Sequence, residues 1–204
     1  MEIIQEITGK YQTNVYLLYD EETKKAVMID PGERVTEIER IIEEKALEVE
    51  RILLTHGHLD HISEVDYYQE KYGPKLGAYV DEKDLLLDPA LNLTRTLDKQ
   101  VKLTCDEYYH DGDRIDPFDI QVIHTPGHTE GSCSYLVGEN LFAGDTLFYQ
   151  SAGRWDLPTG NLGHLMSSLE KLLAPENEWI VYSGHGQATD TTFERLTNPF
   201  SPYQ

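Results

Sequence analysis

Residues 49–61 read VERILLTHGHLDH, and this stretch decides how the rest of the chain is interpreted. Its first half, residues 49–54, is apolar and β-branched enough to form a strand. Directly after that strand, His56, His58, Asp60 and His61 place four potential metal ligands within six residues. Imidazole and carboxylate groups suit zinc, iron and manganese. Because side chains so close in sequence splay apart, we expect them to supply one side each of two ions.

Closing two such sites requires further ligands from distant loops. Three candidates follow predicted strands or lie in the loop after one: His128, Asp145 and His185.

The order of predicted elements is repeated along the chain. In the first half we predict strands at 15–19 and 26–29, a helix at 34–46, a strand at 49–54, and a short helix at 63–71 that Ser63 is able to cap. In the second half we predict strands at 134–137 and 141–143, a helix at 161–173 and a strand at 179–182. Each series has an acidic residue after its second strand and a histidine after its last. The pattern predicts two similar β-rich halves, packed sheet on sheet with helices outside, in one domain over residues 1–204.

Composition narrows the classes of partner. The chain has 17 basic and 37 acidic residues and a formal net charge of −20. The electrostatic field of this negative charge repels phosphate backbones and anionic lipids, so we expect neither nucleic acid nor a membrane as a partner. No signal peptide or long apolar run is evident, which favours a cytoplasmic location. Two cysteines do not make a disulfide framework.

Four motifs together resemble the metallo-β-lactamase superfamily, and their order most resembles its glyoxalase II-like branch. They are the HxHxDH stretch at 56–61, TPGHT at 125–129 followed by Gly131-Ser132, GDTLF at 144–148, and SGHG at 183–186. The resemblance implies an α+β fold, the αββα sandwich, with two mixed β-sheets packed face to face and helices on both outer faces.

The resemblance also implies a role for each residue. His56, His58 and His128 match the ligands of a first metal, and Asp60, His61 and His185 match those of a second. Asp145 matches the carboxylate that bridges both ions, since its two oxygens can span metals about 3.5–4 Å apart. Asp30 matches a residue that supports the histidine loop through hydrogen bonds and is not a ligand.

The activity implied is that of a binuclear metal-dependent hydrolase. Two divalent ions, zinc first and iron or manganese as alternatives, would hold a bridging hydroxide that cleaves a small-molecule thioester or related acyl substrate. Asp145 and Asp60 are the expected catalytic residues, Asp60 because it can also orient the hydroxide. Arg154 is a candidate anchor for a substrate carboxylate, although it could instead pair with Asp156 and only shape its loop.

Alternatives remain open at this point. A mononuclear-iron persulfide dioxygenase of the same fold would use His56, His128 and Asp145, a two-histidine, one-carboxylate set. A metal-binding regulatory domain with little catalysis is a further alternative. Zinc β-lactamases commonly have a cysteine where this chain has Asp145, which argues against that branch. The short segment after His185 puts glutathione as thiol carrier in doubt. The sequence does not determine the oligomeric state.

Overall fold

The computed structural model describes residues 1–98 and 100–203. It divides into two compact units, the first formed by residues 1–78 and 83–108 and the second by residues 79–82 and 109–204. The assignment of one domain to the whole chain stays a prediction. Within the described ranges, no helix combines the length and the apolar composition needed to cross a bilayer.

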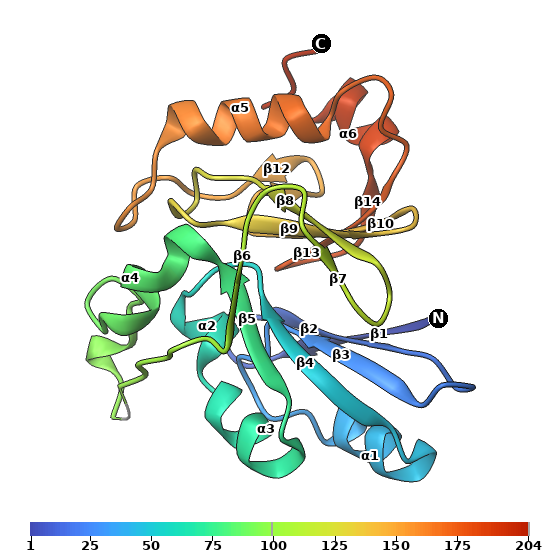
Figure 1. The fold of residues 1–204 in the computed structure, drawn as a ribbon. Coiled ribbons are helices and arrows are strands. Elements are labelled where there is room, and N and C mark those ends of the chain that lie inside the picture. Colours follow the sequence, from blue (N-terminus) through green and yellow to red (C-terminus); the bar gives the residue numbers. More distant parts are fainter. Residues whose placement is uncertain (99, 204) are drawn as a thin grey trace. The chain divides into compact units, whose positions relative to one another are not determined.

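The first unit is built on a six-stranded mixed sheet in the order β1-β2-β3-β4-β5-β6 (Figure 1). Strands β1, β2 and β3 pair antiparallel, whereas β3, β4 and β5 pair parallel. The elements are β1 (Glu2–Thr8), β2 (Thr13–Tyr19), β3 (Lys25–Ile29), α1 (Thr36–Lys45), β4 (Glu48–Leu54), α2 (Leu59–Ile62), α3 (Val65–Tyr72), β5 (Lys75–Tyr79), α4 (Lys83–Leu87), the 3₁₀ turn η2 (Thr94–Thr96) and β6 (Glu107–Tyr109).

Apolar residues on α1 and on the strands form the core of this unit. Ile38, Ile41 and Ile42 are buried on α1, and their spacing places them on one helix face. They belong to one cluster with strand residues such as Met28 and Ile52. Burying a side chain of this size contributes about 1.5–3 kcal/mol, so the cluster holds helix and sheet together. In Figure 1, α1 and α3 lie along the same face of the sheet.

The second unit contains a six-stranded sheet in the order β14-β13-β10-β9-β8-β7 and a small hairpin, β11-β12. Strands β10 and β13 pair parallel, and the other pairs are antiparallel. The elements are the 3₁₀ turn η1 (Val80–Glu82), β7 (Arg114–Ile115), β8 (Ile120–His124), β9 (Cys133–Val137), β10 (Asn140–Gly144), β11 (Leu147–Phe148), β12 (Ser151–Ala152), α5 (Leu162–Leu172), β13 (Ile180–Ser183), β14 (Thr189–Asp190) and α6 (Thr191–Thr197). Leu165, Leu169 and Leu172 of α5 pack on Leu141 and Val181 of the sheet, and α5 covers one face of it (Figure 1).

The predicted repeat of elements is present in both units. In the first, β2 pairs antiparallel with β3, α1 follows, and β4 then pairs parallel with β3. In the second, β9, β10, α5 and β13 are related in the same way. The carboxyl ends of the two parallel strands therefore lie side by side in each sheet. Asp30 and His56 follow one such pair of ends, and Asp145 and His185 follow the other.

One local prediction was wrong. The helix expected at 63–71 is present as α3, at Val65–Tyr72, but Ser63 is not its N-cap, because this residue ends the preceding helix α2. Its hydroxyl donates to the carbonyl oxygen of Leu59 one turn earlier, so it does not cap α3. By contrast, Asn161 caps α5, because its side chain accepts a hydrogen bond of 3.0 Å from the backbone N–H of His164. The strand β5 lies in a middle region where no strand was predicted.

Candidate metal centre

The seven predicted ligands occur in two groups, one in each compact unit. His56, His58, Asp60 and His61 belong to the first unit, in the turn after β4 and the helix α2. His128, Asp145 and His185 belong to the second, in loops that follow β8, β10 and β13.

Three imidazole rings are packed together in the first group. The ring centroids of His56 and His58 are 4.8 Å apart, and those of His56 and His61 are 4.2 Å apart. All three residues are at most 2% exposed. One ligand atom each from Asp30, His56 and His61 lies within 4.8 Å of the others. This is a dense set of nitrogen donors in a buried position, which suits a bound cation.

Asp30 orients this group from the end of the neighbouring strand. Its Oδ1 accepts from the backbone N–H of Thr55 at 2.8 Å, and its Oδ2 accepts from the Thr55 hydroxyl at 2.6 Å. The same Oδ2 lies 3.0 Å from Nδ1 of His61. Because a carboxylate only accepts, Nδ1 carries the proton, and the lone pair of His61 is on Nε2. The geometry agrees with the supporting role that the resemblance implies for Asp30.

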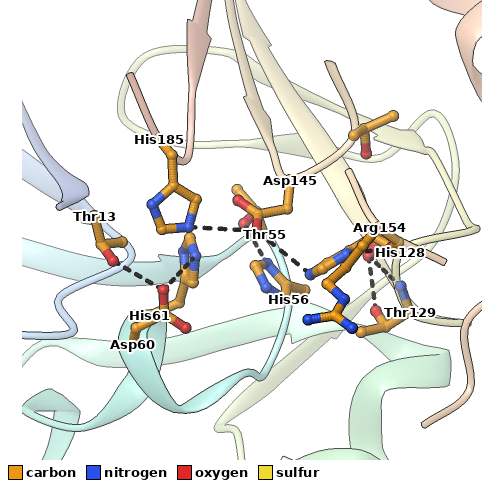
Figure 2. A network of polar contacts seen from close by, with 12 residues as sticks. Thr13, Thr55, His56, Asp60, His61, His128, Thr129, Asp145, Arg154 and His185 are labelled. Atoms are coloured by element: carbon orange, nitrogen blue, oxygen red, sulfur yellow. Dashed lines mark hydrogen bonds and ion pairs between the residues drawn. The ribbon is translucent and has the colours of Figure 1, made fainter. Parts of the chain in front are cut away.

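Asp60 lies at the start of α2 and is held by a residue far away in sequence. The hydroxyl of Thr13 donates to Oδ2 of Asp60 at 2.9 Å, and this oxygen lies 3.7 Å from Nε2 of His61 (Figure 2). The backbone of Asp60 is fixed by Gly32, where a Cβ atom would lie 1.5 Å from the carbonyl oxygen of Asp60. Only glycine permits this approach, so the loop after β3 sets the position of the carboxylate.

Asp145 lies between two histidines in the second group. Its Oδ2 is 3.4 Å from Nε2 of His128 and also 3.4 Å from Nε2 of His185 (Figure 2). The Nδ1 atom of His128 donates to the backbone carbonyl of Arg154 at 2.7 Å. A Cβ atom at Gly153 would lie 1.7 Å from the carbonyl oxygen of Asp145, so glycine is needed for this close packing.

The donor set of each group fits a divalent metal. His61 and His128 both carry their proton on Nδ1, and the Nε2 lone pair of each faces a carboxylate oxygen at 3.7 Å or 3.4 Å. Two acceptors at such a distance repel unless a cation binds them or the imidazole takes a second proton. Metal-binding histidines typically have their second ring nitrogen held by a partner, and carboxylate oxygens commonly complete the set of ligands.

Residues 8–185 match the Metallo-beta-lactamase superfamily. The chain belongs to this superfamily.

Members of the metallo-β-lactamase superfamily are mostly metal-dependent hydrolases that bind divalent ions, and the clusters of histidine and aspartate described above agree with that chemistry. The chain is 38% identical over 200 residues to the Bacillus subtilis protein named "Probable metallo-hydrolase YqgX", covering 94% of this chain and 93% of that protein. It is 34% identical over 199 residues to "Hydroxyacylglutathione hydrolase GloC" of Haemophilus influenzae, covering 93% of each.

Solved structures confirm the fold class predicted from the sequence. The crystal structure of BLEG-1 B3 metallo-beta-lactamase aligns with a TM-score of 0.89 and 36% identity, covering 98% of this chain and 100% of that chain. The crystal structure of TTHA1623 in a di-iron-bound form aligns with a TM-score of 0.84 and 32% identity, covering 97% of this chain and 99% of that chain. The expected αββα sandwich of the metallo-β-lactamase superfamily is therefore correct.

Arg154 is engaged within its own loop. Its Nε and Nη2 atoms donate to the two carboxylate oxygens of Asp156 at 2.8 Å and 2.9 Å. These hydrogen bonds raise the pKa of Arg154 and lower the pKa of Asp156. Both side chains are exposed, so a substrate carboxylate would have to compete with Asp156. The substrate-binding role of Arg154 stays a prediction, and the backbone carbonyl of Arg154 orients His128.

Sequence reasoning missed the residues that hold the loop of His128. The hydroxyl of Thr129 donates to Oε2 of Glu82 at 2.9 Å and lies 2.7 Å from the hydroxyl of Ser132. Glu82 is only 1% exposed, and a Cβ atom at Gly131 would lie 2.2 Å from its backbone nitrogen. Nothing in the local pattern around Glu82 distinguishes it from an exposed acidic residue, because its partner is 47 positions away.

Proposed function

We propose that this protein is a binuclear metal-dependent hydrolase that cleaves a thioester of the hydroxyacylglutathione type. The observation that carries the proposal is the position of Asp145, one oxygen of which lies 3.4 Å from an imidazole nitrogen on either side. A carboxylate between two histidines is the arrangement that a metal-bridging ligand needs. Similarity to the Haemophilus influenzae GloC protein supports the substrate class.

The proposed ligands follow the superfamily resemblance. His56, His58 and His128 would hold one ion, Asp60, His61 and His185 the other, with Asp145 shared. When bound, divalent ions supply Lewis acidity and lower the pKa of water from about 15.7 toward about 7. Zinc is the first choice, and iron is supported by the di-iron form of TTHA1623.

The chain itself positions the proton-accepting group. Thr13 holds the Asp60 carboxylate through Oδ2 at 2.9 Å, and Gly32 fixes its backbone. We propose that Asp60 orients the attacking water and accepts a hydrogen bond from it, in addition to binding metal. A thiol leaves as the thiolate without a strong acid, since thiols have a pKa of about 8.5. No protein nucleophile is required by this reaction.

The test combines metal content with turnover. Protein purified without added metal is analysed for zinc, iron and manganese, and it is assayed with S-lactoylglutathione. We expect close to two ions per chain and hydrolysis of the thioester. In the Asp145→Asn variant we expect both activity and metal content to fall, whereas the Asp119→Asn variant, at an exposed residue outside the site, should keep both. If Asp145→Asn retained two ions per chain, the bridging assignment would be wrong.

Two other outcomes point to different activities. One iron per chain, no hydrolysis and oxygen consumption with glutathione persulfide would favour the mononuclear dioxygenase with His56, His128 and Asp145 as ligands. Hydrolysis of a β-lactam is a second candidate, favoured by the 36% identity with BLEG-1 B3 metallo-beta-lactamase. Assays with a chromogenic cephalosporin and with the thioester distinguish the β-lactamase from the thioester hydrolase, because the kcat/KM values show which substrate is preferred.

A further inference from the structure

A buried glutamate in the second unit has no role in the proposed set of metal ligands. Glu194 lies on α6 and is 0% exposed. Its Oε2 accepts from the backbone N–H of Gln150 at 2.9 Å and from the side-chain amide of Asn198 at 2.8 Å, and its Oε1 accepts from the hydroxyl of Thr189 at 2.6 Å. These donors are neutral. Burying a carboxylate costs free energy that such hydrogen bonds offset only in part, so a contribution to stability is a poor account of Glu194.

The first segment that Glu194 holds is the tip of the hairpin β11-β12. Gln150 is the second residue of its two-residue turn and has a positive φ of 51°. Asn198, at the end of α6, extends the contact, because its amide also donates to the backbone carbonyl of Ser151 at 3.0 Å. The rings of Tyr149 and Phe193 stack with their centroids 5.5 Å apart. The tip of the hairpin is therefore fixed to α6.

The base of the same hairpin adjoins Asp145. Strand β11 begins two residues after Asp145, and a Cβ atom at Gly153, the residue after β12, would lie 1.7 Å from the carbonyl oxygen of Asp145. The next residue is Arg154, whose backbone carbonyl accepts from Nδ1 of His128 at 2.7 Å. A shift of the hairpin would therefore move Asp145 and the carbonyl that orients His128 together.

The second segment that Glu194 holds follows His185. Thr189, which donates to Glu194, is the first residue of β14 and lies four positions after His185. The start of this loop is held as well, since the hydroxyl of Ser183 donates to the carbonyl oxygen of Leu147 at 2.6 Å. Glu194 thus joins the far end of the His185 loop to the hairpin that follows the proposed bridging carboxylate.

We propose that Glu194 is a positioning residue of the metal centre. By holding the hairpin and the end of the His185 loop, it keeps Oδ2 of Asp145 at 3.4 Å from an imidazole nitrogen on either side. A carboxylate oxygen and an imidazole lone pair repel each other until a cation binds them, so their arrangement needs support from outside the ligand set. A buried network with every member hydrogen-bonded supplies such rigidity. The inference rests on the proposed metal centre and adds to it a residue that is not a ligand.

Two substitutions separate the acceptor role of Glu194 from its bulk. Glu194→Met keeps the length of the side chain but removes both acceptors, so the N–H of Gln150 and the amide of Asn198 lose this partner. Glu194→Gln keeps an acceptor for these two donors, and its own amide can donate to the hydroxyl of Thr189, which is able to accept. We expect Glu194→Met to weaken zinc binding about tenfold, the lower end of the range for residues that orient ligands, and Glu194→Gln to stay within about twofold of the wild type.

Thr191→Val is the matched control on the same helix. The hydroxyl of Thr191 is buried, donates to the carbonyl oxygen of Asn177 at 2.8 Å and accepts from the N–H of Trp179 at 2.9 Å, and neither partner is adjacent to a proposed ligand. The control variant should lose stability in urea unfolding, as Glu194→Met does, but it should bind zinc like the wild type.

Zinc affinity is measured on folded, metal-free protein by competition with a chromogenic chelator, and the absorption spectrum of the cobalt(II) form reports the arrangement of the ligands. Weaker zinc binding and an altered cobalt spectrum in Glu194→Met, with both kept in Glu194→Gln and Thr191→Val, support the positioning role. Unchanged binding and spectrum in Glu194→Met, or an equal loss in Thr191→Val, would overturn it and leave the hydrolase proposal standing. Because neither readout uses a substrate, failure of the wild type to hydrolyse S-lactoylglutathione would remove only the proposed reaction.

Discussion

Replacing Asp30 by Asn tests how far the metal ligands depend on their supporting hydrogen bonds. Asp30 is 1% exposed and its carboxylate contacts the N–H and the hydroxyl of Thr55 and Nδ1 of His61. Asn has the same shape, and it tolerates the left-handed backbone that Asp30 adopts, with φ of 52°. The substitution therefore changes the hydrogen bonding and little else.

The expected cost follows from the geometry. Oδ2 of Asp30 serves two groups, the Thr55 hydroxyl and His61 Nδ1, whereas Oδ1 serves the backbone N–H of Thr55. In Asn an amide NH₂ replaces one of these acceptors and faces a donor. A buried polar group left without its partner costs about 1–3 kcal/mol, so we expect the metal-free protein to lose that much stability. If His61 moves its proton to Nε2 in response, that nitrogen can no longer bind metal, and metal affinity should fall about 10–100-fold.

Two measurements check this prediction. Urea unfolding in the presence of a chelator gives the free energy of unfolding without metal, and zinc titration against a competing dye gives the affinity. Asp119→Asn is the matched control, because Asp119 also has a positive φ, 54°, but lies in an exposed turn where it pairs with Arg114. We expect it to change stability by less than about 0.5 kcal/mol. If Asp30→Asn behaved like Asp119→Asn in both measurements, the supporting role of Asp30 would be refuted.

Two further predictions concern the packing around the site, and a third concerns the effect of bound zinc on stability. Gly153→Ala places a Cβ atom 1.7 Å from the carbonyl oxygen of Asp145, so it should destabilise the protein by about 1–3 kcal/mol in urea unfolding and lower the metal content measured by elemental analysis. Glu82→Ala removes the buried acceptor of the Thr129 hydroxyl and should cost about 1–3 kcal/mol in the same assay, whereas the exposed neighbouring Asp81→Ala variant should stay close to the wild type. Zinc added to chelated protein at 100 times its Kd should stabilise it by about 2.7 kcal/mol, measured as a shift of the urea midpoint, and no shift would argue against a site in the folded state.

The sequence was sufficient for the elements that carry the ligands, because the signals involved are local. The apolar run before His56 predicted β4, and the three-to-four spacing of Ile38, Ile41 and Ile42 predicted α1. Strand pairing was harder to predict from the sequence. Strand β5 was missed because its residues show no clear alternation of polar and apolar side chains, and because its position depends on pairing with β4. The Ser63 cap failed for a related reason, since a serine can bond either to a preceding carbonyl or to a following N–H, and the surrounding fold selects one.

The candidate site likewise has features that the sequence predicted and features that only the tertiary structure showed. The sequence by itself determined the superfamily and predicted the types of ligand and their order along the chain, because residues with metal-binding chemistry follow predicted strands at recognisable motifs. The supporting role of Asp30 was implied by the resemblance, but the other side chains that orient the predicted ligands were decided by the tertiary structure alone. Thr13 reaches Asp60 and Glu82 reaches Thr129, each across 47 positions of sequence. Such pairs leave no periodic or compositional signal, since a hydrogen bond between distant loops depends on how the backbone folds between them and not on which residues are neighbours in the chain.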